Sequence, residues 1–129
     1  MVRLLPGADA ARFLPLTPQV FQILLSLSDQ PLHGYAIIAD IGERTNGEIQ
    51  LTASTLYDAL ARLVDQELIE ELDAPPPNAV DHDARRRYYA LSDLGRHVAK
   101  LEAGRLQRLL DMARDKRLVP ASNRPRGRR

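Results

Sequence analysis

The sequence predicts a mainly α-helical fold with one small β-hairpin and a long final helix. Three segments with apolar residues at helical spacing come first. Two short runs rich in strand-forming residues follow, and they flank a stretch with three consecutive prolines. The order of these patterns divides the chain into an N-terminal arm at 1–15, a core domain at 16–91, a final helix at 92–118 and a basic tail at 119–129.

The first two helices are expected at residues 17–28 and 34–45. Thr17 followed by Pro18 is typical of a helix start, because the hydroxyl caps free N–H groups and proline fits the first helical position. The apolar stripe of the first helix consists of Leu16, Val20, Ile23, Leu24 and Leu27. After the breaker PLHG, the apolar face of the second helix is expected to consist of Tyr35, Ile38, Ala39 and Ile41.

The third helix is expected at residues 53–66, with Thr52 as its cap. Its apolar face consists of Leu56, Leu60, Leu63 and Val64. Strands are expected at about 68–73 and 86–91, and Ser92 caps the final helix. Two helices joined by a short turn and followed by a hairpin predict a winged helix-turn-helix, in which the hairpin is the wing.

The net charge of +1 conceals two halves of opposite sign. Residues 1–84 hold 4 Lys or Arg against 13 Asp or Glu, a balance of −9, and residues 85–129 hold 14 against 4, a balance of +10. Such asymmetry is typical of proteins that bind nucleic acid or membrane surfaces, although a basic tail can simply be solvated. The chain has no cysteine and its N-terminal residues form neither a signal peptide nor a membrane span, so we expect a cytoplasmic protein.

Catalytic and metal-binding patterns are weak. The three histidines fall in a turn, a loop and a helix, and no nucleophile elbow or phosphate-binding glycine loop accompanies them. Asp81, His82 and Asp83 resemble metal ligands, but neighbouring residues on one loop rarely converge on one ion. We therefore expect no enzyme activity, no cofactor and no metal site.

The exposed face of the third helix carries the residue types that can enter a DNA groove. Ser54 and Thr55 supply hydroxyl groups near free N–H groups at the helix start, and Tyr57 can reach a phosphate or a base edge. Arg62 lies further along and is expected to reach phosphate only. Asp58 is the exception, and it fits either an acceptor for a cytosine amino group or a charge that penalises wrong registers.

Positive charge is expected mainly on the wing, at Arg85, Arg86 and Arg87. Alternation along a strand sends Arg86 to one face and its two neighbours to the other, so at least one arginine should face DNA. The alternative is that these arginines pair with acidic residues of the facing strand. Those acidic residues are Glu70, Glu71 and Asp73.

Three runs of the sequence together resemble the PadR-like family of bacterial transcriptional regulators. They are LPLTPQVFQILLSLSDQPLHGYAI, STLYDALARLVDQELIEE and RRRYYALSDLGR, and they cover most of residues 14–100. The resemblance implies a winged-helix DNA-binding domain, transcriptional repression, and a homodimer in which the final helix packs on the first helix of the partner. The interface residues that it implies are Val20, Leu24, Val98, Leu101, Leu106, Leu109, Leu110 and Ala113.

Two positions depart from the family pattern. Ser54 stands where the family usually has glycine before TLY, and it keeps a hydroxyl at the helix start. Glu67 stands where the family usually has glycine before the first wing strand, and it lacks the freedom of glycine to adopt positive φ. We expect a strained or differently shaped turn at Glu67.

The function expected from these patterns is that of a homodimeric transcriptional repressor that binds double-stranded DNA. Each third helix would enter a major groove of a pseudo-palindromic operator, with half-sites about 10 bp apart or a multiple of that spacing. An alternative of another class is a winged-helix dimer that serves as a small-molecule or protein interaction module. A third alternative is an architectural DNA binder without sequence preference. Both the repressor and the interaction module leave open a small-molecule effector that the sequence does not identify.

Overall fold

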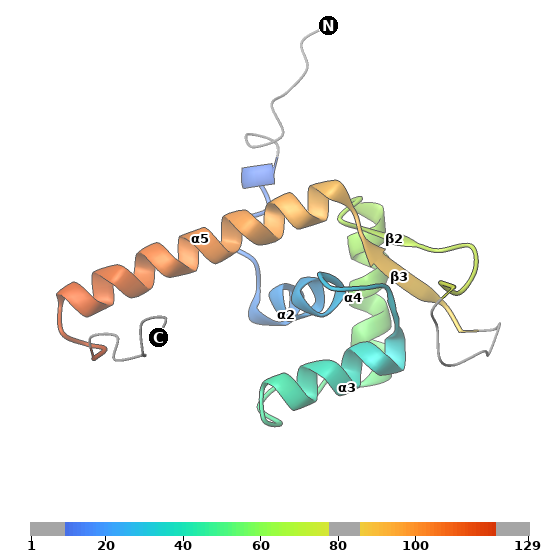
Figure 1. The fold of residues 1–129 in the computed structure, drawn as a ribbon, viewed down its shortest axis with the longest axis horizontal. Helices are drawn as coiled ribbons and strands as arrows, with labels where there is room; N and C mark the ends of the chain where they lie inside the picture. Colours follow the sequence, from blue (N-terminus) through green and yellow to red (C-terminus); the bar gives the residue numbers. More distant parts are fainter. Residues whose placement is uncertain (1–9, 78–85, 121–129) are drawn as a thin grey trace, which may run out of the picture.

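A computed structural model describes residues 10–77 and 86–120 of the chain. The helices are α2 (Pro18–Leu27), α3 (Gly34–Arg44), α4 (Ala53–Asp65) and α5 (Asp93–Asp115), and the strands are β1 (Leu32–His33), β2 (Ile69–Glu71) and β3 (Tyr88–Leu91). A small antiparallel sheet lies at one edge of the helices, and α5 crosses α2 before it extends away from the other helices (Figure 1). The predicted fold class, mainly α-helical with a wing hairpin and a C-terminal helix, is confirmed.

Hydroxyl caps begin three of the helices, as the sequence predicts. The side chain of Thr17 accepts a hydrogen bond from Val20 N, that of Thr52 accepts from Thr55 N, and that of Ser92 accepts from Gly95 N. Each bond satisfies one of the N–H groups that the first turn of a helix leaves without a partner. These caps fix the residues at which α2, α4 and α5 begin.

The expected apolar face of α3 is correct at Ile38 and Ile41 and wrong at Tyr35 and Ala39. Gly34, Ile37 and Ile41 are the buried residues of this helix, whereas Tyr35 and Ala39 are exposed. Gly34, Ile37 and Ile41 also recur at helical spacing, so periodicity alone does not distinguish this face from the expected one. Glycine, which has no side chain, gave no apolar signal at the first position. The correction turns Tyr35 outward, beside the wing.

The sheet has three strands in the order β1-β3-β2, so the predicted hairpin gains a strand that the sequence did not reveal. Leu32 pairs with Tyr89 and His33 pairs with Tyr88, and on the other side Ile69 pairs with Leu91. Two residues cannot show a period, which is why the PLHG run was read only as a helix breaker. The wing is thereby attached to the start of α3.

Glu67 adopts φ 65°, the left-handed conformation that glycine would take there. Leu68 N donates to Leu63 O and Glu67 N donates to Val64 O, which is the Schellman pattern at the end of α4. The Ser92 hydroxyl donates to the Glu67 carbonyl at 2.7 Å and ties this turn to the start of α5. The turn therefore has the shape that glycine would give it, and the cost lies in the contact of the Glu67 Cβ with the backbone at this φ.

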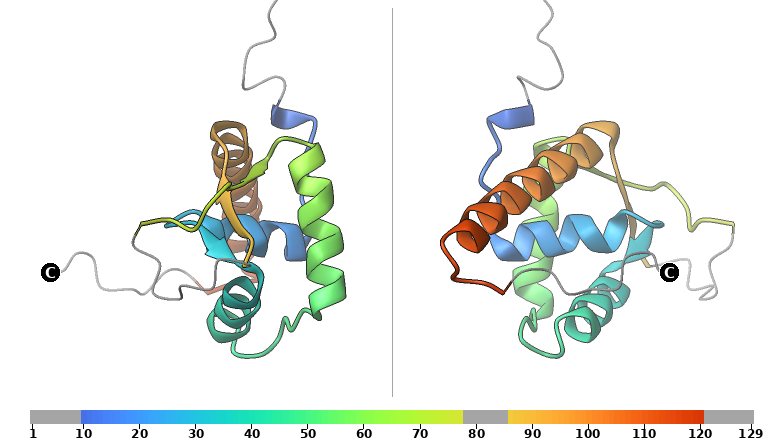
Figure 2. Two further views of the ribbon diagram at one scale, coloured as in Figure 1. Left: turned by 90° about the vertical axis from the view of Figure 1, so that its right-hand side faces the viewer. Right: turned by 60° about the vertical axis from the view of Figure 1, so that its left-hand side comes forward.

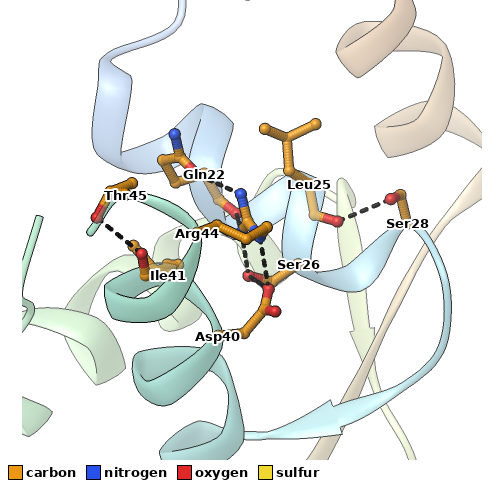
Figure 3. Close-up of polar contacts among 8 residues, drawn as sticks. All are labelled: Gln22, Leu25, Ser26, Ser28, Asp40, Ile41, Arg44 and Thr45. Carbon is orange, nitrogen blue, oxygen red and sulfur yellow. Dashed lines mark hydrogen bonds and ion pairs between the residues drawn. The ribbon is translucent and has the colours of Figure 1, made fainter. Parts of the chain in front are cut away.

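A polar network joins α2 to α3 (Figure 3). Ser26 donates to Asp40 at 2.7 Å, and Arg44 donates to Asp40 at 2.8 Å and to Ser26 at 2.7 Å. Burial alone would raise the pKa of Asp40, but the hydrogen bonds from Ser26 and Arg44 outweigh burial and hold that pKa below its ordinary value. The network fixes the angle of α3 against α2.

α3 and α4 lie beside each other and are joined by the turn at residues 45–52 (Figure 2). Apolar side chains from all four helices meet in one core beneath this pair. The wing strands and α4 lie at one end of the molecule, and the C-terminal half of α5 points the opposite way (Figure 1). Over the described residues, no helix is long and apolar enough to cross a membrane.

Candidate nucleic-acid interface

Hydroxyl groups gather at the start of α4. Thr52 Oγ1 donates to Thr55 Oγ1 at 2.9 Å and lies 3.4 Å from Ser54 Oγ. All three side chains are exposed, and the first N–H groups of the helix lie beside them. Because a helix start and its hydroxyl groups favour phosphate oxygens, this hydroxyl cluster is suited to contact a nucleic-acid backbone. The sequence had assigned Thr52 only a capping role.

Tyr57 lies one turn further along α4 and packs against the start of α3. A Cβ added at Gly34 would lie 2.6 Å from Tyr57 Cζ, so only glycine leaves room for the ring. The tyrosine is 36% exposed, which leaves its edge accessible. The HGY and TLY runs of the sequence therefore meet in space, and Gly34 sets where Tyr57 points.

Arg86 packs between the wing and α3. Its guanidinium carbon lies 5.8 Å from the centre of the Tyr35 ring, and its Nη1 lies 3.3 Å from His33 Nδ1. The same His33 nitrogen accepts a hydrogen bond from Ala36 N, and the ring meets Tyr88 edge to face. Tyr35 is 62% exposed, and a sequence-based search missed it because it was placed on the buried face of α3.

Arg87 is exposed and faces β2, where its Nε lies 3.8 Å from Glu71 Oε2. The alternative reading of the wing arginines, pairing with the facing strand, therefore holds for this residue. Burial, followed by the charge of Glu71, raises the pKa of Tyr89 beside the pair. Arg86 and Arg87 thus contact different neighbours, as strand alternation predicts, although β3 itself begins only at Tyr88.

Charge along the described part of this surface is nearly balanced. Asp58 and Arg62 are both exposed on α4, and the side chain of neither makes a hydrogen bond or ion pair within residues 10–77 and 86–120. Asp65 and Glu71 offset the two described wing arginines. Arg85 lies outside the described residues, as do Asp81, His82 and Asp83. Among the described residues, no group of three metal-ligating side chains lies together.

The residues expected at a dimer interface divide into two groups. Leu24 and Val98 are fully buried in the core of their own chain and have no surface for a partner, which corrects their assignment. Val20 and Leu101 are partly buried against the same core. Leu106, Leu109 and Leu110, which we call the leucine stripe, are 38–48% exposed, and Ala113 is half-buried beside them.

A helix pair with an exposed, hydroxyl-rich second helix, followed by a wing with arginines at its base, defines a winged helix-turn-helix protein of the DNA-binding type. The model of the family described as "Transcriptional regulator PadR-like family" matches residues 23–101. The chain belongs to this family.

The chain is also similar in sequence to two bacterial proteins and in fold to a solved structure. The chain is 38% identical over 87 residues to a 37.1 kDa protein in transposon TN4556 of Streptomyces fradiae, covering 67% of this chain and 22% of that protein. It is 32% identical over 74 residues to protein X of Lysinibacillus sphaericus, covering 57% and 64%. It thus spans less than two thirds of each of these relatives. A PadR family transcription regulator from Clostridium difficile has the same fold, with a TM-score of 0.60 at 23% identity, covering 74% of this chain and 94% of that one.

Proposed function

We propose that this PadR-like protein is a homodimeric repressor that binds a pseudo-palindromic operator in double-stranded DNA. The hydroxyl cluster and Tyr57 would contact the major groove, and Arg86 and Arg87 would contact the flanking backbone. The two-fold symmetry of a dimer requires half-sites about 10 bp apart or a multiple of that spacing. DNA binding, rather than catalysis, is what the exposed polar groups of α4 and the wing can perform.

One observation carries the dimer. The buried positions of α5 are Gly95, Val98 and Glu102, and the same face of the helix continues as Leu106, Leu109 and Ala113. Figure 1 shows this second half of α5 extending beyond α2 and α3. An apolar helix face that extends beyond the core of its own chain is typical of an interface between subunits. A second copy would cover the leucine stripe.

The experiment that tests this proposal replaces the leucine stripe by alanine. We expect the triple variant, Leu106→Ala with Leu109→Ala and Leu110→Ala, to be monomeric by light scattering and to lose operator binding in a gel shift, because one half-site offers a small interface. The matched control is Gln107→Ala with Arg108→Ala, two exposed residues of the same helix segment outside the leucine stripe, of which Arg108 lies on the opposite face. A triple variant that stays dimeric refutes the interface.

Sequence preference is tested separately with the promoter region of the protein's own gene and with unrelated DNA of the same length. A repressor retains the promoter fragment at a salt concentration that releases the unrelated DNA. Equal retention of both fragments would favour an architectural DNA binder. Retention of neither fragment by a folded dimer would favour an interaction module instead.

A further inference from the structure

A hollow of about 310 Å³ lies between α4, the first turns of α2 and the segment that precedes α2. Phe13, Leu16 and Val20 line one side, and Ala59 and Leu63 of α4 line the other. We call this hollow the α4 pocket. Its volume lies at the lower end of the range for small-molecule sites, which are likewise mostly apolar.

The charge that lines the α4 pocket is positive. Among the residues that the structure describes, Arg62 is the only charged residue that lines the pocket, and no aspartate or glutamate does. Within residues 10–77 and 86–120, the Arg62 side chain makes no ion pair or hydrogen bond. Gln66 adds an amide beside the guanidinium, and Thr17 adds a hydroxyl. An apolar hollow with a cation at its edge complements a molecule with an apolar body and one carboxylate.

We propose that the α4 pocket binds a small apolar carboxylic acid, with the carboxylate on Arg62 and the apolar body between α2 and α4. The site is separate from the leucine stripe, because no residue of α5 lines it. Its far wall is the helix that carries the hydroxyl cluster, and Thr55 belongs to both surfaces. A bound acid therefore neutralises Arg62 and contacts the helix that is proposed to enter DNA.

Binding to the pocket is tested without DNA, so its outcome does not depend on the proposed function. The probe is octanoate, titrated into the ¹⁵N-labelled full chain and followed by the amide signals, with octan-1-ol as the uncharged counterpart. We expect shifts at residues of α2 and α4, and binding of octanoate about threefold tighter than of octan-1-ol, since exposed ion pairs contribute modestly. Shifts confined to α5, or equal affinity for the acid and the alcohol, overturn the proposal.

Two variants locate the site. Arg62→Gln should remove the preference for the acid over the alcohol, whereas Arg108→Gln, an exposed arginine of α5 outside the pocket, should retain it. Ala59→Leu should fill the hollow and abolish binding of both probes, with folding checked by circular dichroism. If Ala59→Leu does not fold, the Arg62→Gln comparison still decides. An unchanged preference in Arg62→Gln refutes the assignment of the carboxylate.

The effect on DNA rests on the proposed function and is measured afterwards. Octanoate at saturation should weaken operator binding by the wild type, measured by fluorescence anisotropy, because it takes the charge of Arg62 away from phosphate. The Ala59→Leu variant, which cannot hold the acid, should show no such effect of octanoate. Octanoate binding without any change in DNA affinity refutes the coupling and leaves the pocket assignment intact.

Discussion

Arg87 offers the sharpest test of the proposed contact between the wing and DNA. Its guanidinium is exposed and shares its charge with Glu71 across 3.8 Å, in a pair open to solvent on both sides. Exposed pairs of this kind are worth between about 0 and 1 kcal/mol. A phosphate can therefore compete with Glu71 for Arg87 at little cost, and the Arg87→Gln substitution should remove one phosphate contact from each subunit.

The magnitude follows from counterion release. Each phosphate contact contributes about 0.9 to the slope of log affinity against log salt, so a dimer of Arg87→Gln should lose about 1.8 from that slope. A fourfold change in salt, from about 50 to about 200 mM, then changes the affinity ratio of wild type to variant by about twelvefold. The deficit of the variant should be largest in dilute salt. Fluorescence anisotropy with an operator selected from a random DNA library measures both slopes.

Removing the competing carboxylate should have the opposite effect. Glu71→Gln frees Arg87, and about 0.5 kcal/mol per subunit corresponds to about fivefold tighter binding by the dimer. The control is Glu70→Gln, which makes the same change of charge on the neighbouring exposed residue of β2, where no ion pair forms among the described residues. Identical salt slopes for wild type and Arg87→Gln, or equal gains from Glu71→Gln and Glu70→Gln, would refute the role given to Arg87.

Three further predictions concern the start of α3, the turn after α4 and the middle of α5. Gly34→Ala should displace Tyr57 and weaken operator binding by about 1 kcal/mol per subunit, whereas Gly42→Ala, whose added Cβ meets no atom within 4 Å, should leave binding unchanged in the same anisotropy assay. Glu67→Gly should raise the free energy of unfolding in urea by about 1 kcal/mol, because glycine adopts φ 65° without strain. Hydrogen bonds from Arg105 outweigh the cost of burial and lower the pKa of Glu102 from its ordinary value of 4.5. The free energy of unfolding should therefore fall as the pH drops below 4.5 and Glu102 becomes protonated. In thermal melts, the Glu102→Gln variant should lack this part of the pH dependence.

Patterns longer than two helical turns could be predicted from the sequence, because periodic burial and capping leave a repeated signal. Thr17, Thr52 and Ser92 show this, since each cap was predicted from a hydroxyl before an apolar stripe and each accepts the expected N–H. The two residues of β1 gave no such signal. Its existence depends on pairing with β3, which lies more than fifty residues further along the chain.

The surroundings of individual side chains were harder to predict than the elements that carry them. Tyr35 was assigned to the core because it falls at helical spacing with Ile38, yet Gly34 takes the buried position so that the Tyr57 ring can approach. That choice depends on the angle between α3 and α4, which no local pattern encodes. Likewise, the pairing of Arg87 with Glu71 follows from strand register, and the sequence left both readings open.

The near-neutral surface of α4 and the wing would make DNA recognition depend on the proposed dimer. A single subunit with Asp58 and Asp65 beside Arg62 has little long-range attraction for a polyanion, so its affinity for any DNA should be low. Joining two such surfaces makes the second contact intramolecular and multiplies affinity only where both half-sites fit. A weakly charged α4 therefore favours specificity over general DNA affinity. In the proposed dimer, occupancy of the operator would also depend directly on how well the leucine stripe holds the two subunits together.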